Sequence, residues 1–314
     1  MDTRLRGDDG RRGGQVNRIP FIDAHVHLWD LSQLRYPWLT PPFADDGPNG
    51  SVEAIARDYG LDDYLADASG WDVRGIVHVD AGADPRHALH ETRWLQQMAD
   101  TRGMPNGIVA FADLSYPDLD ALLEAHTAHA NVRGIRHIAN WHADAKRSYT
   151  PRDFTQDDAW RHGFARLAHH GLSFDLQAYP GQFAALAALF ERHPDIPVMI
   201  NHAGMMLPGE EDEWRVGIAR MAALPQVAIK LSGFGFTRRP FDVEIARGII
   251  LSAIDAFGTD RAMFASDFPT DKLFGGFDEM LSAYADIVGD FTDGERRALF
   301  AGNANRLYRL GIAL

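Results

Sequence analysis

The chain has 314 residues, of which 46% are hydrophobic and 24% are charged, so it has an ordinary globular composition and is long enough to bury a full core. It contains no cysteine, which excludes disulfides, thiolate metal sites and a cysteine nucleophile. The net charge of -13 and the lack of an apolar run of about 18 residues argue against nucleic-acid partners and against a membrane protein.

The first segment, residues 1–18, is rich in Gly, Arg and Asp and has none of the apolar character of a secretory signal. We expect it to be a disordered tail, followed by a single domain over residues 19–314. The lack of a signal favours a cytoplasmic location.

Eight short runs of apolar and β-branched residues follow the tail, and the stretches between them show helical spacing, clearest at 89–99, 119–123, 183–190 and 214–222. This order predicts a (β/α)8 barrel, because one βα unit needs roughly 30 residues. A doubly wound sheet is disfavoured, since the first run ends in His-Val-His and has no glycine-rich phosphate turn. The predicted strands are Phe21–Leu28, Gly75–Ala81, Gly107–Asp113, Arg133–Ala139, Leu172–Gln177, Pro197–His202, Val227–Leu231 and Ala262–Ser266.

A long loop rich in aromatic residues and proline follows the first predicted strand and contains Tyr36–Leu39 and residues 47–50. It either covers the barrel mouth as a lid, with Trp38 against the substrate, or packs on the surface with Trp38 buried on the scaffold. The two arrangements are compatible with each other.

Polar residues stand at the carboxyl ends of most predicted strands, which is where barrel enzymes carry their chemistry. His25 and His27 point to the same side of the first strand, so they either bind a divalent ion or form a hydrogen-bonded pair in the core. Asp267, on the eighth strand, lies beside them when the barrel closes, and His202 reaches the mouth from the sixth strand. We predict that His25, His27 and Asp267 bind one divalent ion and that Asp267 and His202 are catalytic.

Other polar residues at the strand ends either bind substrate or pair within the core. Arg136 suits a carboxylate or a carbonyl oxygen, and Lys230 suits either the site or a buried carboxylate. We expect the histidines on helices, His126 among them, to be solvated. The candidates for substrate binding are Trp38, His78, Arg136, His137, Trp141, Gln177 and Asn201.

An ordered set of motifs resembles the amidohydrolase superfamily, amidohydrolase-2 type. The opening segment Phe21–Asp30 is most similar to the lactonase-like group, which includes sugar-acid lactonases, sulfomuconolactone hydrolase and 2-pyrone-4,6-dicarboxylate lactonases. The resemblance implies a (β/α)8 barrel, hydrolysis of a lactone and a site made of His25, His27, His202 and Asp267. The further motifs, which extend the resemblance over residues 19–311, are Tyr36–Leu39, Glu91–Leu95, Gly134–His137, Asn201–Gly204, Lys230–Gly233, Ala265–Pro269 and Gly302–Tyr308.

The chain departs from the dinuclear members of the superfamily at two strands. Arg136 and His137 stand where those members carry a lysine or glutamate ligand, and Asp175 and Gln177 occupy the strand that carries their histidine ligand. We therefore predict at most one ion, with zinc as first choice. A metal-free site is the alternative, because the lactonase group resembles both zinc-using and metal-independent enzymes. Asn201 replaces the usual acidic residue before the strand-six histidine.

These observations predict a lactone hydrolase in which Asp267 deprotonates water; no Gly-x-Ser-x-Gly motif supports an acyl-enzyme. The rivals are a metal-dependent decarboxylase and a non-catalytic ligand-binding barrel. Two substrate classes stay open. A carboxylated lactone is favoured by the basic residues Arg86, Arg136, Lys146, Arg147, Arg238 and Arg239, and a neutral sugar lactone is favoured by Asn140, Trp141, Gln177 and Asn201. A homo-oligomer is also open.

Overall fold

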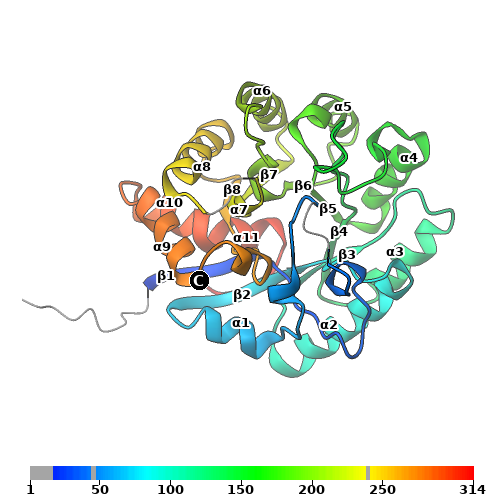
Figure 1. Ribbon diagram of the computed structural model, residues 1–314, viewed down its shortest axis with the longest axis horizontal. Helices are drawn as coiled ribbons and strands as arrows, with labels where there is room; N and C mark the ends of the chain where they lie inside the picture. Colours follow the sequence, from blue (N-terminus) through cyan, green and yellow to red (C-terminus); the bar gives the residue numbers. More distant parts are fainter. Residues whose placement is uncertain (1–16, 44–46, 238–240) are drawn as a thin grey trace, which may run out of the picture.

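The computed structural model describes residues 17–43, 47–237 and 241–314, and these form a barrel of parallel strands with helices around it (Figure 1). The strands follow one another in chain order, each paired in parallel with the next. The prediction of a (β/α)8 barrel is confirmed, because each of the eight predicted runs overlaps an observed strand. The strands are β1 Asn17–Val26, β2 Trp71–Val79, β3 Gly107–Phe111, β4 Val132–Arg136, β5 Ser173–Leu176, β6 Val198–Ile200, β7 Val227–Leu231 and β8 Ala262–Phe264.

The first strand begins earlier than predicted, at Asn17, so the last two residues of the expected tail belong to the barrel. Residues 1–16 of that tail lie outside the described part of the chain, as do Arg238 and Arg239.

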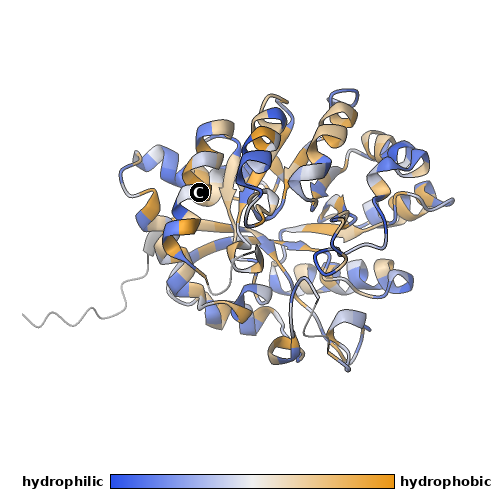
Figure 2. Cartoon of the chain, turned by 45° about the horizontal axis from the view of Figure 1, so that its top comes forward, coloured by the Kyte–Doolittle hydropathy of each residue, from blue (hydrophilic) through white to orange (hydrophobic). Residues whose placement is uncertain are grey.

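The helices lie outside the strands and present their apolar faces to them. In Figure 2 the central strands are mostly hydrophobic, whereas the surrounding helices mix hydrophobic and hydrophilic residues. No helix in the described ranges has the length and apolar character that a bilayer crossing requires. The α-helices are α1 Leu61–Asp67, α2 Ala88–Arg102, α3 Leu119–Thr127, α4 Asp158–Arg166, α5 Phe183–Phe190, α6 Glu211–Ala222, α7 Phe234–Thr237, α8 Val243–Phe257, α9 Phe277–Ile287, α10 Asp293–Arg297 and α11 Asn303–Leu307.

Helix α8 illustrates how the sequence forms these elements. The side chain of Asp242 caps its first turn by accepting a hydrogen bond from the N–H of Ile245 at 3.0 Å. Ile250, Ala253 and Ile254 recur at helical spacing and are buried against the barrel. The cap and the apolar stripe together determine where the helix begins and which face it buries.

The core has two layers, because alternate strand residues point inward and outward. A large cluster fills the space between the strands and the helices, and a smaller cluster fills the barrel itself. The inner cluster contains residues from β1, β2, β3, β6, β7 and β8, with Tyr308 from the C-terminal segment. The barrel is therefore a packed interior, and only its carboxyl-terminal end is available for a site.

The barrel closes through residues at the carboxyl ends of β1 and β8. Val26 bridges Phe268, and the N–H of His27 donates to the carbonyl of Phe268 at 2.8 Å. The N–H of Asp267 donates to the carbonyl of His25 at 2.9 Å. Closure therefore brings the His-x-His strand and Asp267 together.

Candidate active site

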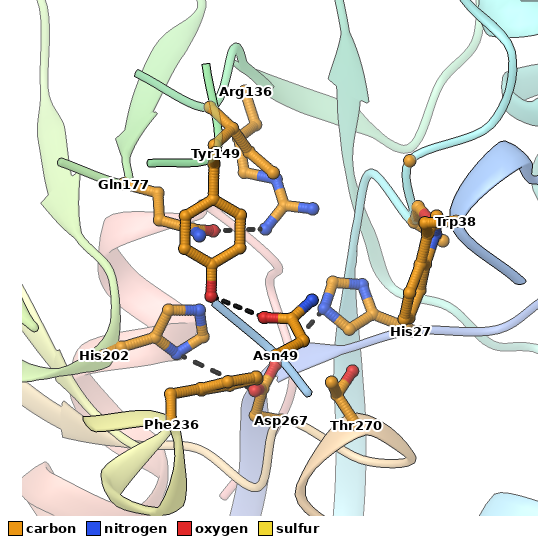
Figure 3. Close-up of a pocket in the computed structure, with 13 residues that line it drawn as sticks. His27, Trp38, Asn49, Arg136, Tyr149, Gln177, His202, Phe236, Asp267 and Thr270 are labelled. Carbon is orange, nitrogen blue, oxygen red and sulfur yellow. Dashed lines mark hydrogen bonds and ion pairs between the residues drawn. The ribbon is translucent and has the colours of Figure 1, made fainter. Parts of the chain in front are cut away.

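The structure brings together the four residues on which the sequence-based prediction centres. His25 Nε2 lies 3.4 Å and His27 Nε2 lies 3.2 Å from Asp267 Oδ1, and the two Nε2 atoms are 3.2 Å apart. His202 approaches from β6, with Nδ1 3.9 Å from Asp267 Oδ2 (Figure 3). All four side chains are buried.

Asp267 combines full burial with an unsatisfied carboxylate. Neither of its oxygens has a hydrogen bond of normal geometry to a described residue, although the nitrogens of His25 and His27 are close. Burying a carboxylate without hydrogen-bond donors is costly, so a buried carboxylate of this kind indicates that a ligand such as water, substrate or a cation binds to it. Its backbone φ of 58° is also uncommon for a residue with a side chain, and such strain concentrates at functional sites.

The backbone around His202 is similarly constrained, with a φ of 52°. Gly233 follows β7 with a φ of 68°, and a Cβ on it would lie 2.5 Å from His202 Nδ1. Any side chain at position 233 would displace the imidazole. His202 Nδ1 also lies 3.2 Å from the hydroxyl of Ser232.

The imidazoles are oriented by different partners. His27 Nδ1 lies 2.8 Å from the carbonyl of Val79 and donates to it, which leaves Nε2 facing Asp267. His25 Nδ1 lies 3.4 Å from Lys230 Nζ. Burial lowers the pKa of His202 to about 4 and, with a smaller contribution from Lys230, lowers the pKa of His25 well below its usual value. These two imidazoles are therefore neutral at neutral pH.

Asp23 is a supporting residue that the sequence analysis did not single out. Its Oδ1 accepts hydrogen bonds from the N–H groups of Ser266 at 2.9 Å and His25 at 3.3 Å, and its Oδ2 accepts one from Tyr64 at 3.0 Å. Burial raises the pKa of Asp23 to about 6 despite these donors. The carboxyl joins β1 to the segment that carries Asp267.

The ligand atoms are spaced suitably for one divalent ion. Nitrogens of His25 and His202 and an oxygen of Asp267 lie within 4.8 Å of one another. The atoms of His25, His27 and Asp267 are closer still, at 3.2–3.4 Å, and ligands on tetrahedral zinc are about 3.3 Å apart. The donor types and the unpartnered carboxylate thus fit a single bound cation.

A cavity of about 200 Å³ opens beside Asp267 (Figure 3). Six residues that the sequence had marked as site residues line it: His27, Trp38, Arg136, Gln177, His202 and Asp267. Four further side chains beyond the strand ends were missed: Asn49, Tyr149, Phe236 and Thr270. Trp38 donates its indole N–H to the carbonyl of Ala81 at 2.8 Å, so the loop after β1 contributes a wall of the cavity.

The remaining substrate-binding candidates lie away from this cavity. His137 follows Arg136 directly and therefore points to the helices, where its Nδ1 accepts from Trp160 at 3.2 Å. His78 Nδ1 accepts from the N–H of Leu28 at 3.2 Å. Asn201 is buried beside the site, and Trp141 is 38% exposed on the loop after β4.

Arg136 faces the cavity but is already paired. Its Nε donates to Asp80 Oδ2 at 3.3 Å, one terminal nitrogen donates to Gln177 Oε1 at 3.0 Å, and the other donates to the carbonyl of Asp80. The charge of this guanidinium is therefore balanced inside the protein. Outside the cavity, Arg86 pairs with Asp84 at 2.7 Å.

Glu91 lies on α2 and is 1% exposed. Its titration tests the effect of burial and of the Asp80 carboxylate, which pairs with Arg136. Burial, and then the charge of Asp80, raise the pKa of Glu91 to about 8. Because this folded-state pKa lies above the unfolded value, the contribution of Glu91 to stability should decline as pH rises from about 5 to about 8. Glu91→Gln should flatten this decline, measured as unfolding temperature across that pH range. Parallel curves for the variant and the wild type would contradict the assignment.

Comparison with known proteins identifies the family. Residues 22–310 match the amidohydrolase family Amidohydro_2. The chain belongs to this family. The resemblance seen in the sequence motifs is thereby confirmed, and the protein is an amidohydrolase-family hydrolase.

Individual proteins match over nearly the whole chain. An uncharacterized protein of Sinorhizobium fredii, y4mH, is 42% identical over 302 residues, which is 94% of this chain and 100% of the relative. An L-fucono-1,5-lactonase of Burkholderia multivorans is 30% identical over 308 residues, covering 92% and 96% of the two chains. A crystal structure of a Burkholderia multivorans amidohydrolase with bound zinc superposes with a TM-score of 0.76 at 27% identity, covering 92% and 99%.

Proposed function

We propose that this protein opens small lactones by direct attack of water, with Asp267 as the general base. The observation that carries the proposal is the buried, unpartnered carboxylate of Asp267 at the wall of a cavity that His27 and His202 also line. The similarity to L-fucono-1,5-lactonases supports the choice of a lactone among hydrolase substrates.

The chemistry requires a base, a polarised carbonyl and an acid for the leaving alkoxide. Asp267 takes a proton from water as the water attacks the carbonyl carbon. In the metal-free site, the neutral imidazoles of His25 and His202 donate hydrogen bonds to the carbonyl oxygen as negative charge develops on it. The protonated carboxyl of Asp267 then returns its proton to the ring oxygen as the ring bond breaks, which yields a hydroxy acid.

One divalent ion, with zinc as first choice, would be held by His25, His27 and Asp267. When bound there it lowers the pKa of water toward 7 and polarises the carbonyl. We expect elemental analysis to find no more than one tightly held ion per chain, and zinc to raise the unfolding temperature of chelated protein. Two tightly held ions would contradict this expectation. Full activity after exhaustive chelation would favour polarisation by the imidazoles alone.

A decarboxylase is the rival reaction on this fold. The end of β5 disfavours it, because Asp175 is engaged by Lys230 and by Tyr308 at 2.9 Å and is not free to bind a metal. Product analysis separates the two functions, since a lactonase yields a ring-opened acid and a decarboxylase yields carbon dioxide.

We further propose that the reacting ring is neutral and hydroxylated, as in a sugar lactone. Arg136 is balanced by Asp80, so in the metal-free protein a carboxylate on the ring would meet Asp267 without a free cation from the described residues of the cavity. Like-charge repulsion at this range should lower kcat/KM about tenfold. A pH-indicator assay of matched sugar lactones with and without a ring carboxylate tests this. Preference for the carboxylated ring would overturn the substrate class, and no turnover of any lactone would overturn the function.

A further inference from the structure

A second cavity of about 300 Å³ adjoins the first, and Tyr149 and Phe236 line both. Figure 3 shows these two rings at the border of the inner cavity. Tyr149 also donates to Asn49 Oδ1 at 2.5 Å, which links the loops after β4 and β1. The two cavities are therefore neighbouring compartments at the same end of the barrel.

The inner cavity is small for a complete substrate. At about 200 Å³ it accommodates a lactone ring with short substituents, whereas ligand sites in proteins usually occupy roughly 300–1,000 Å³. A longer substituent on a ring beside Asp267 must leave past Tyr149 and Phe236. The outer cavity is the space that it enters.

The outer cavity has an apolar wall that is fixed to the catalytic end of the barrel. Tyr179, Met205 and Leu207 form a separate buried cluster, against which Tyr149 and Phe236 pack. Met205 has a φ of 49°, a strained value for a residue with a side chain, and its N–H donates to the carbonyl of His202 at 2.8 Å. Tyr179 donates to the carbonyl of Arg147 at 2.7 Å. Such a wall suits the chain or ring of an apolar substituent.

Among the residues that the structure describes, the charged ones that line the outer cavity are both cations, Lys146 and Arg147. Arg147 pairs with Glu210 at 3.1 Å, but exposed Lys146 forms no ion pair with any residue that the structure describes. In a protein of net charge -13, an ammonium that lines a cavity and has no ion-pair partner among the described residues is a local attraction for an anion.

We propose that the outer cavity is a second substrate subsite, which holds an apolar substituent of the lactone that ends in an anionic group such as a carboxylate. This proposal rests on the proposed lactone hydrolysis, because the ring beside Asp267 determines where the substituent begins. The ring itself is neutral, and the negative charge is carried at the far end of the substituent, next to Lys146.

Three δ-lactones test the subsite: one without a chain, one with a pentyl chain and one with a chain of equal length ending in a carboxylate. We expect the pentyl chain to lower KM at least about tenfold, since full burial of roughly two of its methylenes is sufficient for that factor, and the carboxylate to lower it about threefold to fivefold more. Lys146→Gln should abolish only the additional decrease in KM that the terminal carboxylate gives. Arg220→Gln is the matched control, because Arg220 is an exposed cation on α6. This variant should keep the KM decreases that the pentyl chain and the carboxylate give. Leu207→Asn should raise KM for both chain-bearing lactones relative to the parent.

The outcomes separate the two proposals. Turnover of the parent lactone with no gain from either chain, or a carboxylate preference that survives Lys146→Gln, overturns the subsite and leaves the lactonase function intact. If no lactone is turned over, the function fails. The subsite is then decided by calorimetric binding of the corresponding tetrahydropyrans, which keep the chains but cannot be hydrolysed. Equal affinity of the three tetrahydropyrans overturns it.

Discussion

Asp267→Asn is expected to lower kcat/KM for a lactone substrate by about 10²–10⁴-fold while leaving the fold intact. An amide has the shape of the carboxylate but cannot take the proton of the attacking water. The fold should tolerate the change, because no described residue forms a normal hydrogen bond to the carboxylate and asparagine readily adopts the φ of 58° found there.

Steady-state kinetics and a thermal unfolding curve of the same preparation check this expectation. The matched control is Asp113→Asn, which alters a carboxyl near His137 that lies outside the cavity and should retain activity. A folded Asp267→Asn protein with near wild-type turnover would show that another group is the base.

Lys230→Met is expected to lower the free energy of unfolding by about 3–5 kcal/mol. Lys230 is fully buried and pairs with Asp175, whose carboxylate also accepts from Tyr308 at 2.9 Å. Removing the ammonium leaves a buried carboxylate with one neutral donor. Because Lys230 Nζ also lies 3.4 Å from His25 Nδ1, the loss should extend to the orientation of that imidazole.

Denaturant unfolding of the single variant and of Lys230→Met combined with Asp175→Leu measures the effect. The double variant should recover much of the lost stability, since it removes the unpaired charge as well. A single variant as stable as the wild type, or a double variant less stable than the single one, would show that the pair is not a coupled unit.

The sequence was sufficient to predict the strands because most of them are covered on both faces and so contain continuous apolar or β-branched runs. It was also sufficient to bring His25, His27 and Asp267 together, since a closed barrel places its first and last strands side by side. Both inferences depend on periodicity and closure, which are properties of the backbone and need no knowledge of loops.

Side chains on loops and beyond the strand ends could not be placed in this way. Asn49 and Tyr149 reach the cavity because two long loops fold back over the barrel mouth, and tertiary contacts decide that course. His137 stands one residue past the end of β4, where side-chain direction depends on the final register of the strand. The expectation that His126 is solvated was wrong: it is buried, with its ring nitrogens 2.9 Å from Thr92 and 3.1 Å from the carbonyl of Phe111.

The barrel closes between β1 and β8 at the proposed site residues His25, His27 and Asp267. This arrangement has a consequence for protein synthesis. The bond between the N–H of Ser266 and Asp23 joins positions 243 residues apart, and Asp267, the proposed base, follows Ser266 directly. During translation the histidines of β1 are synthesised long before Asp267, which the ribosome adds only after the eighth strand. Incomplete chains that lack the eighth strand therefore contain the His-x-His pair but not Asp267. If Asp267 is the base, as proposed, activity requires a chain that has added and docked its last βα unit.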